Sequence, residues 1–212
     1  METLLFSAYE CAASLIPFSA AFIFLSHTHK KNGQKTNFLH NSLLFLFAAY
    51  IICVYHVTGS GTLWDIFLYH LQTETFYFNP IPFSTGIDIV GYILNIILFI
   101  PFGFLIPLIW KKMRSLYHTI FAGFSFSLLI EISQLLNNRR TDIDDLIMNT
   151  FGAVVGFVIY KIFKKLIPTR LHNKLNDSSS PALELVIYIL ILFAGRFFLF
   201  HEMGFAKLLF GF

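Results

Sequence analysis

The sequence from 88 to 110 reads DIVGYILNIILFIPFGFLIPLIW, and this stretch decides the fold class. Asp88 is its only charged residue and Asn95 its only amide. A run of about 20 mostly apolar residues is long enough to cross the hydrocarbon core of a bilayer as a helix. We therefore predict a transmembrane helix over 88–110.

Five more stretches of the same kind flank this one along the chain. They cover 4–26, 38–57, 116–136, 143–163 and 183–202. None alternates apolar and polar residues as a barrel strand does, so all are predicted to be helices. Only 13% of the residues are charged, against about 25% in a soluble domain. The sequence predicts an all-α, polytopic membrane helix bundle of about six transmembrane helices, with a five-helix core and an added C-terminal helix.

The distribution of lysine and arginine predicts how the bundle is oriented in the cell membrane. Three connections rich in these residues follow the first, third and fifth helices, and such connections usually face the cytoplasm. Both termini and the loops at 58–87 and 137–142 are then expected outside. Leu63, Trp64, Phe67 and Leu68 recur at helical spacing in the first of these loops, which predicts an interfacial helix. This helix would be either an aromatic belt or a lid over a site.

A polar cluster between 131 and 149 interrupts the apolar pattern. Ionisable groups within a membrane segment are expensive, so they are candidates for function. Glu131 and Gln134 share one helix face, and Asp145 and Asn149 share another. Asn95 is expected at a similar depth. The cluster also contains two arginines on the predicted outer side, against the usual charge bias; these are Arg139 and Arg140.

These residues predict a small polar pocket that opens outward. Glu131 is the candidate catalytic residue, as a general base, or else a carboxylate partner for a cationic group. The guanidinium groups of Arg139 and Arg140 have the geometry to grip a phosphate. The remaining candidates for substrate binding share amide or carboxylate chemistry. They are Asn95, Gln134, Asp145 and Asn149.

Structural interpretations of the same residues are also open. Glu131 would pair with an arginine and latch two helices together. Asp142 or Asp144 would cap the helix that begins near 143. The pattern Gly152-x-x-x-Gly156 would let another helix approach closely.

Several classes of function are not indicated. A net charge of +3 is too small to indicate nucleic-acid binding. The eight histidines and two cysteines show no zinc spacing, and the aspartates lack an EF-hand frame. No Gly-rich phosphate loop is present, so we expect neither a metal nor a cofactor. The expected partners are the lipid membrane and a phosphate-bearing envelope lipid or wall precursor.

Taken together, several motifs resemble the VanZ-like family of small membrane proteins. The matching segments lie between 79 and 160 and are specific in their order and spacing. They are Asn79-Pro-Ile-Pro82-Phe83, Asn95 to Gly103 including Pro101-Phe102-Gly103, Glu131-Ile-Ser-Gln134, Arg140-Thr-Asp142-Ile-Asp144-Asp145, and Asn149 to Gly156.

The resemblance implies a VanZ-like membrane domain over 1–167 with its motif core at 79–160. A cytoplasmic linker would follow at 168–182, and an extra C-terminal helix and tail at 183–212. The family takes its name from a member associated with resistance to glycopeptide antibiotics, especially teicoplanin, so the resemblance implies a role in the cell envelope. We expect a protein that binds or modifies an envelope lipid or lipid-linked polymer. A transporter or flippase, and a structural bundle with a charged latch, are the alternatives.

Overall fold

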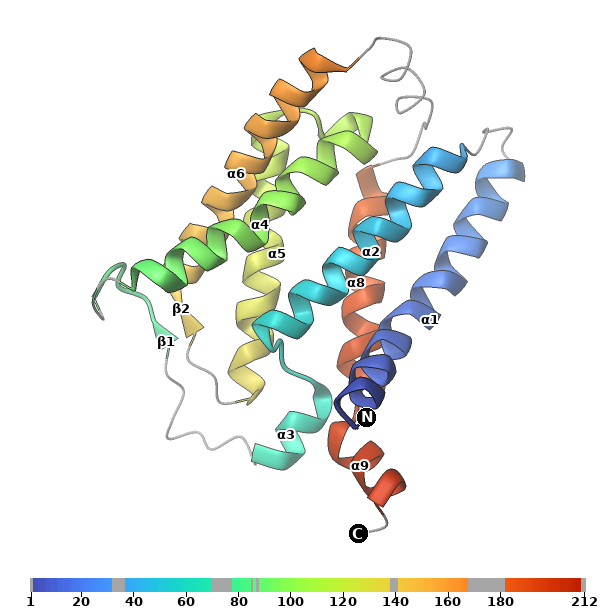
Figure 1. Cartoon of the computed structure of the whole chain (residues 1–212), viewed down its shortest axis with the longest axis vertical. Helices are drawn as coiled ribbons and strands as arrows, with labels where there is room; N and C mark the ends of the chain where they lie inside the picture. The colour runs from blue at the N-terminus through green and yellow to red at the C-terminus, as the bar shows by residue number, and fades with distance from the viewer. Residues whose placement is uncertain are drawn as a thin grey trace.

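The computed structural model describes residues 2–31, 37–69, 78–84, 86, 88–137, 141–167 and 182–210. They form a bundle of helices (Figure 1). The long helices are α1 (Glu2–Lys31), α2 (Phe38–Thr58), α4 (Ile89–Ile109), α5 (Leu116–Gln134), α6 (Ile143–Leu166) and α8 (Ala182–Leu199). The short elements are α3 (Leu63–Tyr69), α9 (Glu202–Phe210), the 3-10 turns η2 (Lys111–Met113) and η3 (Leu135–Asn137), and the strands β1 (Phe78–Asn79) and β2 (Thr141–Asp142).

The predicted all-α membrane bundle is confirmed. Among the described residues, five helices are long and apolar enough to cross a membrane, namely α1, α2, α4, α5 and α6. The helix predicted at 183–202 is α8, and its 18 residues span about 27 Å at 1.5 Å per residue. The helix predicted in the loop after α2 is α3, while the rest of that loop between 70 and 77 lies outside the described residues.

Polar residues at the edges of the apolar stretches set the helix ends. Asp88 caps α4 by accepting from the Gly91 N–H, and Ser115 caps α5 in the same way. Asp142 caps α6 by accepting from the Asp144 N–H, as predicted. Gly59 ends α2 with φ 58°, a left-handed conformation that glycine adopts without steric cost. These caps explain why the sequence predicted the boundaries to within a few residues.

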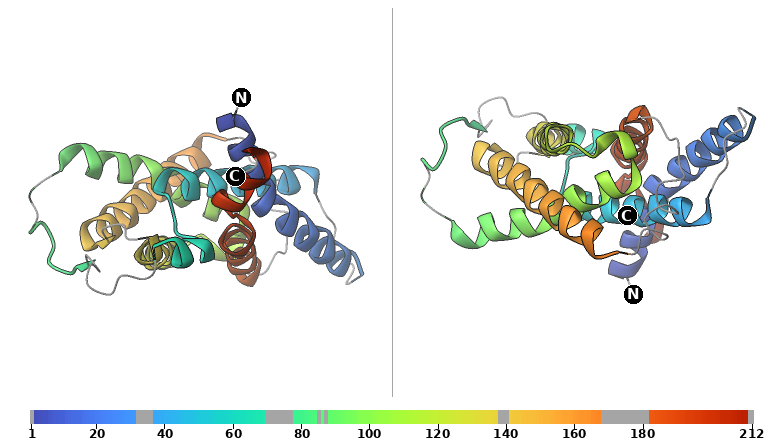
Figure 2. Two further views of the ribbon diagram at one scale, coloured as in Figure 1. Left: turned by 90° about the horizontal axis from the view of Figure 1, so that it is seen from below. Right: turned by 90° about the horizontal axis from the view of Figure 1, so that it is seen from above.

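The helices form two groups that meet at α2. Helices α4, α5 and α6 pack on one side of α2 and α1 on the other, while α8 runs along α1 and also contacts α2 (Figure 2). The centre of the bundle is filled with aromatic rings. Phe102 of α4 stacks on Phe126 of α5 with ring centroids 4.8 Å apart, and Tyr55 of α2 meets the Phe126 ring edge-on.

The ends of the helices are arranged as the orientation prediction requires. The C-terminal ends of α1, α4 and α6, which carry the lysines, lie together at one end of the bundle in Figure 1. The two chain termini, α3 and the C-terminal end of α5 lie towards the other end. We call the second group the α3 end of the bundle. Its placement outside the cell stays a prediction.

Candidate site between helices α4, α5 and α6

Close contact between α4 and α6 brings the predicted site residues together. A Cβ atom added at Gly152 would collide with the backbone oxygen of Ile96, and one added at Gly156 would collide with that of Ile100. The packing role predicted for the two glycines is confirmed. Because the backbones touch here, side chains nearer the α4 and α6 N-termini can also reach each other.

Asn95 and Asp145 make that connection. The Asn95 Nδ2 donates to Asp145 Oδ1 at 2.6 Å. Glu131 of α5 and Asp145 of α6 are close enough for their carboxylates to interact electrostatically. The Glu131 residue is 5% exposed. Three helices thus bring an amide and two carboxylates together, with Glu131 buried and Asn95 and Asp145 half-buried. Their role as a binding site stays a prediction.

Asn149 lies one turn further along α6. It is 2% exposed, and its Nδ2 donates to the hydroxyl of Ser127 on α5 at 2.9 Å. Sequence reasoning did not single out Ser127. Its position four residues before Glu131, on the same face of α5, is the signal that would have found it.

Asp142 and Asp144 tie the segment before α4 to the start of α6. The Asn79 Nδ2 donates to both oxygens of Asp142 at 3.2 Å, and β1 pairs with β2 in parallel. Asp144 does not cap α6. Its carboxylate accepts from the backbone N–H of Phe83 at 2.9 Å and from the Tyr92 hydroxyl at 2.6 Å.

The hydrogen bonds to Asp142 and Asp144 connect motif segments that are more than 50 residues apart in sequence. Phe83 has φ 59°, which costs a residue with a Cβ roughly 1–2 kcal/mol, and the Asp144 carboxylate holds its N–H in place. Thr141 in β2 completes the edge by donating its hydroxyl to the Glu131 backbone oxygen at 3.3 Å. Asn79, Tyr92 and Thr141 are therefore positioning residues. Asn79 and Thr141 belong to the motif segments that carry the family resemblance, whereas Tyr92 was not singled out from the sequence.

Gln134 takes a direction that the sequence did not predict. Its Nε2 donates to the Thr58 carbonyl at the end of α2 at 2.7 Å, and Asn137 Nδ2 donates to the Gly59 carbonyl at 2.9 Å. Because a carbonyl can only accept, the amide nitrogens must face α2. Gln134 and Asn137 thus fix α5 to the end of α2.

The free polar atoms of the region are acceptors. Within the described part of the chain, four buried side-chain oxygens here have no hydrogen-bond partner. They are Glu131 Oε2, Gln134 Oε1, Asn137 Oδ1 and Asn149 Oδ1. Arg139 and Arg140 lie outside the described residues. The described part of the site therefore suits a ligand that donates hydrogen bonds, such as an ammonium or a hydroxyl group.

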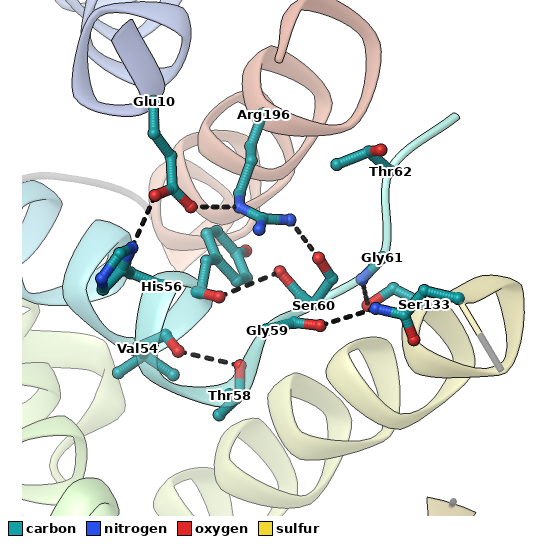
Figure 3. Close-up of polar contacts among 12 residues, drawn as sticks. Glu10, Val54, His56, Thr58, Gly59, Ser60, Gly61, Thr62, Ser133 and Arg196 are labelled. Carbon is teal, nitrogen blue, oxygen red and sulfur yellow. Dashed lines mark hydrogen bonds and ion pairs between the residues drawn. The ribbon is translucent and has the colours of Figure 1, made fainter. Parts of the chain in front are cut away.

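A second buried charge cluster was missed by the sequence analysis. Glu10 of α1 accepts from Arg196 Nε of α8 at 2.7 Å and contacts His56 Nδ1 of α2 at 2.6 Å (Figure 3). Arg196 also donates through Nη1 to the Ser60 carbonyl. Glu10 is the only charged residue in the apolar stretch at 4–26, and Arg196 is the only lysine or arginine in the stretch at 183–202. These isolated charges were the available signal.

The fold and site define a multi-pass α-helical membrane protein with a buried carboxylate site between three helices. The VanZ/LLP1 family matches residues 45–164, which include all three of these helices. The chain belongs to this family.

A relative described as Protein VanZ, from Enterococcus faecium, is 30% identical over 128 residues. That alignment covers 60% of this chain and 76% of the relative. No solved structure matches the chain. The family match begins within α2, contains α3 to α5 and nearly all of α6, and excludes α1, α8 and α9.

Proposed function

We propose that this protein binds the headgroup of an envelope lipid, or of a lipid-linked wall polymer, at the site between α4, α5 and α6. The carboxylate of Glu131 carries the proposal. It is buried, and its Oε2 has no hydrogen-bond partner among the described residues. The Asp142 backbone N–H is a partner of this carboxylate, but no cation pairs with it in the described part of the chain. A buried carboxylate without a cationic partner is costly, so its presence favours a role in binding or catalysis.

The other buried carboxylates of the chain strengthen this reasoning. Glu10 is compensated by Arg196 and His56. Glu184, which is 3% exposed, accepts from Trp110 Nε1 at 3.1 Å and from the Tyr188 hydroxyl at 3.2 Å. Each oxygen of these two carboxylates thus has a partner within the protein. Glu131 differs in having an oxygen available to a ligand.

The chemistry of the site favours a ligand with two kinds of group. The acceptor oxygens of Glu131, Asp145 and Asn149 suit an ammonium or hydroxyl group of a headgroup. Arg139 and Arg140, only eight and nine residues after Glu131, suit a phosphate. Lipid headgroups and lipid-linked wall precursors combine these groups, and the outer face is where they would meet the predicted pocket.

Binding is favoured over transport by the packing below the site. The stacked rings of Phe102 and Phe126 fill the middle of the bundle, together with the buried rings of Phe99 and Tyr55. A flippase needs a polar route past this layer, and the described helices present an aromatic core there instead.

Mass spectrometry of lipids that co-purify with the gently extracted protein tests the proposal. We expect a phosphate-bearing envelope lipid with the wild-type chain and its loss with Glu131→Gln. Glu184→Gln is the matched control, because it makes the same change in an equally buried carboxylate at the opposite end. Equal ligand retention in Glu131→Gln and the wild type would refute a binding role for the carboxylate.

The same pair of variants separates binding from catalysis. A general base that becomes an amide loses turnover while the ligand stays bound. A carboxylate that only binds loses ligand affinity. Retained ligand that is no longer chemically changed would assign catalysis to Glu131.

We propose in addition that ligand binding alters susceptibility to teicoplanin, as the family resemblance implies. In a susceptible host that expresses the chain, we expect teicoplanin tolerance to depend on Glu131 and on Arg140. Arg140→Ala should remove the effect while membrane insertion is unchanged. Full tolerance with a well-expressed Arg140→Ala variant would contradict the phosphate-binding role.

A further inference from the structure

A cavity of about 600 Å³ lies at the α3 end of the bundle, apart from the Glu131 site. Its walls come from the α2–α3 connection and α3 on one side and from the end of α8 and α9 on the other. We call it the α3–α9 pocket. None of Asn95, Glu131, Asp145 or Asn149 lines it, although Asn137, which bonds to the Gly59 carbonyl, does. Its volume falls in the usual range for small-molecule sites, about 300–1,000 Å³.

Arg196 supplies a buried cationic group to this pocket. It is 7% exposed and is held in place by Glu10 and by the Ser60 carbonyl (Figure 3). The guanidinium also lies over the Phe200 ring, 5.5 Å from its centroid. A guanidinium has five N–H donors, and these contacts use two of them. The other three have no hydrogen-bond partner among the described residues. They make a fixed fork for a phosphate.

The pocket carries charges of both signs. Arg196 and Lys207 are cationic, and Asp65 and Glu202 are anionic. Asp65 Oδ2 accepts from the Thr62 N–H at 2.6 Å, which fixes this carboxylate at the wall. The formal charges of the lining side chains therefore cancel, so the pocket is complementary to a headgroup that itself carries both signs.

The remaining walls are apolar and reach the surface. Trp64 stacks on His201 with ring centroids 4.0 Å apart and donates its Nε1–H to the Phe198 carbonyl at 3.3 Å. Phe67 is 64% exposed and Met203 is 44% exposed. Both line the pocket, so its mouth opens onto apolar side chains of the kind that contact acyl chains.

We propose that the α3–α9 pocket binds a zwitterionic phospholipid. The phosphate lies on the free edge of Arg196, the ammonium lies toward Asp65 and Glu202, and the acyl chains pass over Phe67 and Met203. This site is independent of the proposed function at Glu131. Because α8 and α9 lie outside the family match, it is a property of this chain rather than of the shared core.

Native mass spectrometry of the full-length chain in detergent tests the proposal. Phosphatidylethanolamine and phosphatidylglycerol with identical acyl chains are added separately. We expect phosphatidylethanolamine to bind at least about tenfold more tightly, since the contact between its ammonium and the carboxylates is a charge-assisted hydrogen bond. Equal or tighter binding of phosphatidylglycerol would overturn the headgroup assignment.

Variants locate the binding. Arg196→Met alone leaves Glu10 buried and unpaired, so the test uses the double variant Glu10→Leu/Arg196→Met, which removes both charges. We expect it to lose at least about tenfold in affinity for phosphatidylethanolamine. Lys112→Gln, an exposed cation at the other end of the bundle, is the control and should bind as the wild type does.

Tryptophan emission gives an independent readout. Trp64 lines the pocket, whereas Trp110 is fully buried at the other end. We expect a saturable change in tryptophan emission when phosphatidylethanolamine is added to the wild type. This change should disappear in Trp64→Phe and persist in Glu131→Gln. If the double variant binds like the wild type, or if Glu131→Gln abolishes the signal, the lipid binds elsewhere and the proposal is wrong.

Discussion

The buried ion pair between Glu10 and Arg196 should be the strongest single tie between α1 and α8. The two charged atoms are 2.7 Å apart, and the side chains are 6% and 8% exposed. Removing one partner of such a pair leaves a buried charge and typically destabilises a protein by about 3–5 kcal/mol. Replacing both partners by apolar side chains of similar volume is often close to neutral.

We therefore expect Arg196→Met to lower the free energy of unfolding by about 3–5 kcal/mol. The variant leaves Glu10 with His56 as its remaining partner, and the His56 side chain is 60% exposed, so this contact replaces the guanidinium only in part. The double variant Glu10→Leu/Arg196→Met should be more stable than Arg196→Met alone. This recovery identifies the loss as a charge effect rather than a packing effect.

Unfolding in mixed micelles with increasing dodecyl sulfate, followed by tryptophan fluorescence and circular dichroism, measures these differences. Lys111→Met, an exposed cation at the opposite end, should stay within about 0.5 kcal/mol of the wild type. A loss below about 1 kcal/mol in Arg196→Met, or a double variant less stable than both single variants, would refute a buried pair.

Three further results are expected. Gly156→Val should destabilise the bundle by about 3 kcal/mol or more, because its Cβ collides with the α4 backbone, whereas Val158→Leu on the exposed face of α6 should be nearly neutral; equal effects in the same unfolding assay would contradict the α4–α6 contact. Asp144→Ala removes the acceptor of the Phe83 N–H, so hydrogen exchange should speed up at the Phe83 amide and stay unchanged in α1; protection equal to the wild type would argue against the contact between Asp144 and Phe83. In a variant without Cys11 and Cys53, Asn138→Cys should be labelled from outside the cell and Lys112→Cys only after permeabilisation, and the reverse result would invert the predicted orientation.

Much of the fold was predictable because the bilayer allows few alternatives. A long apolar stretch must satisfy its backbone hydrogen bonds internally, so it forms a helix. Polar residues such as Asp88, Ser115 and Asp142 then mark where each helix begins. The grouping of Asn95 with Asp145 was also predictable, since helical spacing and equal depth restrict which side chains can meet.

The pairing of distant residues was not predictable in the same way. Glu10 and Arg196 are 186 positions apart, and nothing in the local sequence says that α8 packs beside α1. Gln134 shares a helix face with Glu131, yet its amide faces the end of α2, because the Thr58 carbonyl there needs a donor. Which partner a side chain meets depends on how the helices pack side by side. The periodicity of a single helix gives no information about that packing.

The connection between α2 and α3 is hydrogen-bonded to a residue near each of the two proposed sites. On one side the Ser60 carbonyl accepts from Arg196, which lines the α3–α9 pocket. On the other side the Gly61 N–H donates to the Ser133 hydroxyl at 3.2 Å, two residues beyond Glu131 on α5. An added Cβ at Gly61 would collide with the Ser133 carbonyl, so this connection cannot move toward α5. A lipid that draws Arg196 away from Ser60 would release only the opposite side, and α5 would keep its register through Ser133. The structure therefore favours a pocket that can fill or empty while Glu131 stays in place.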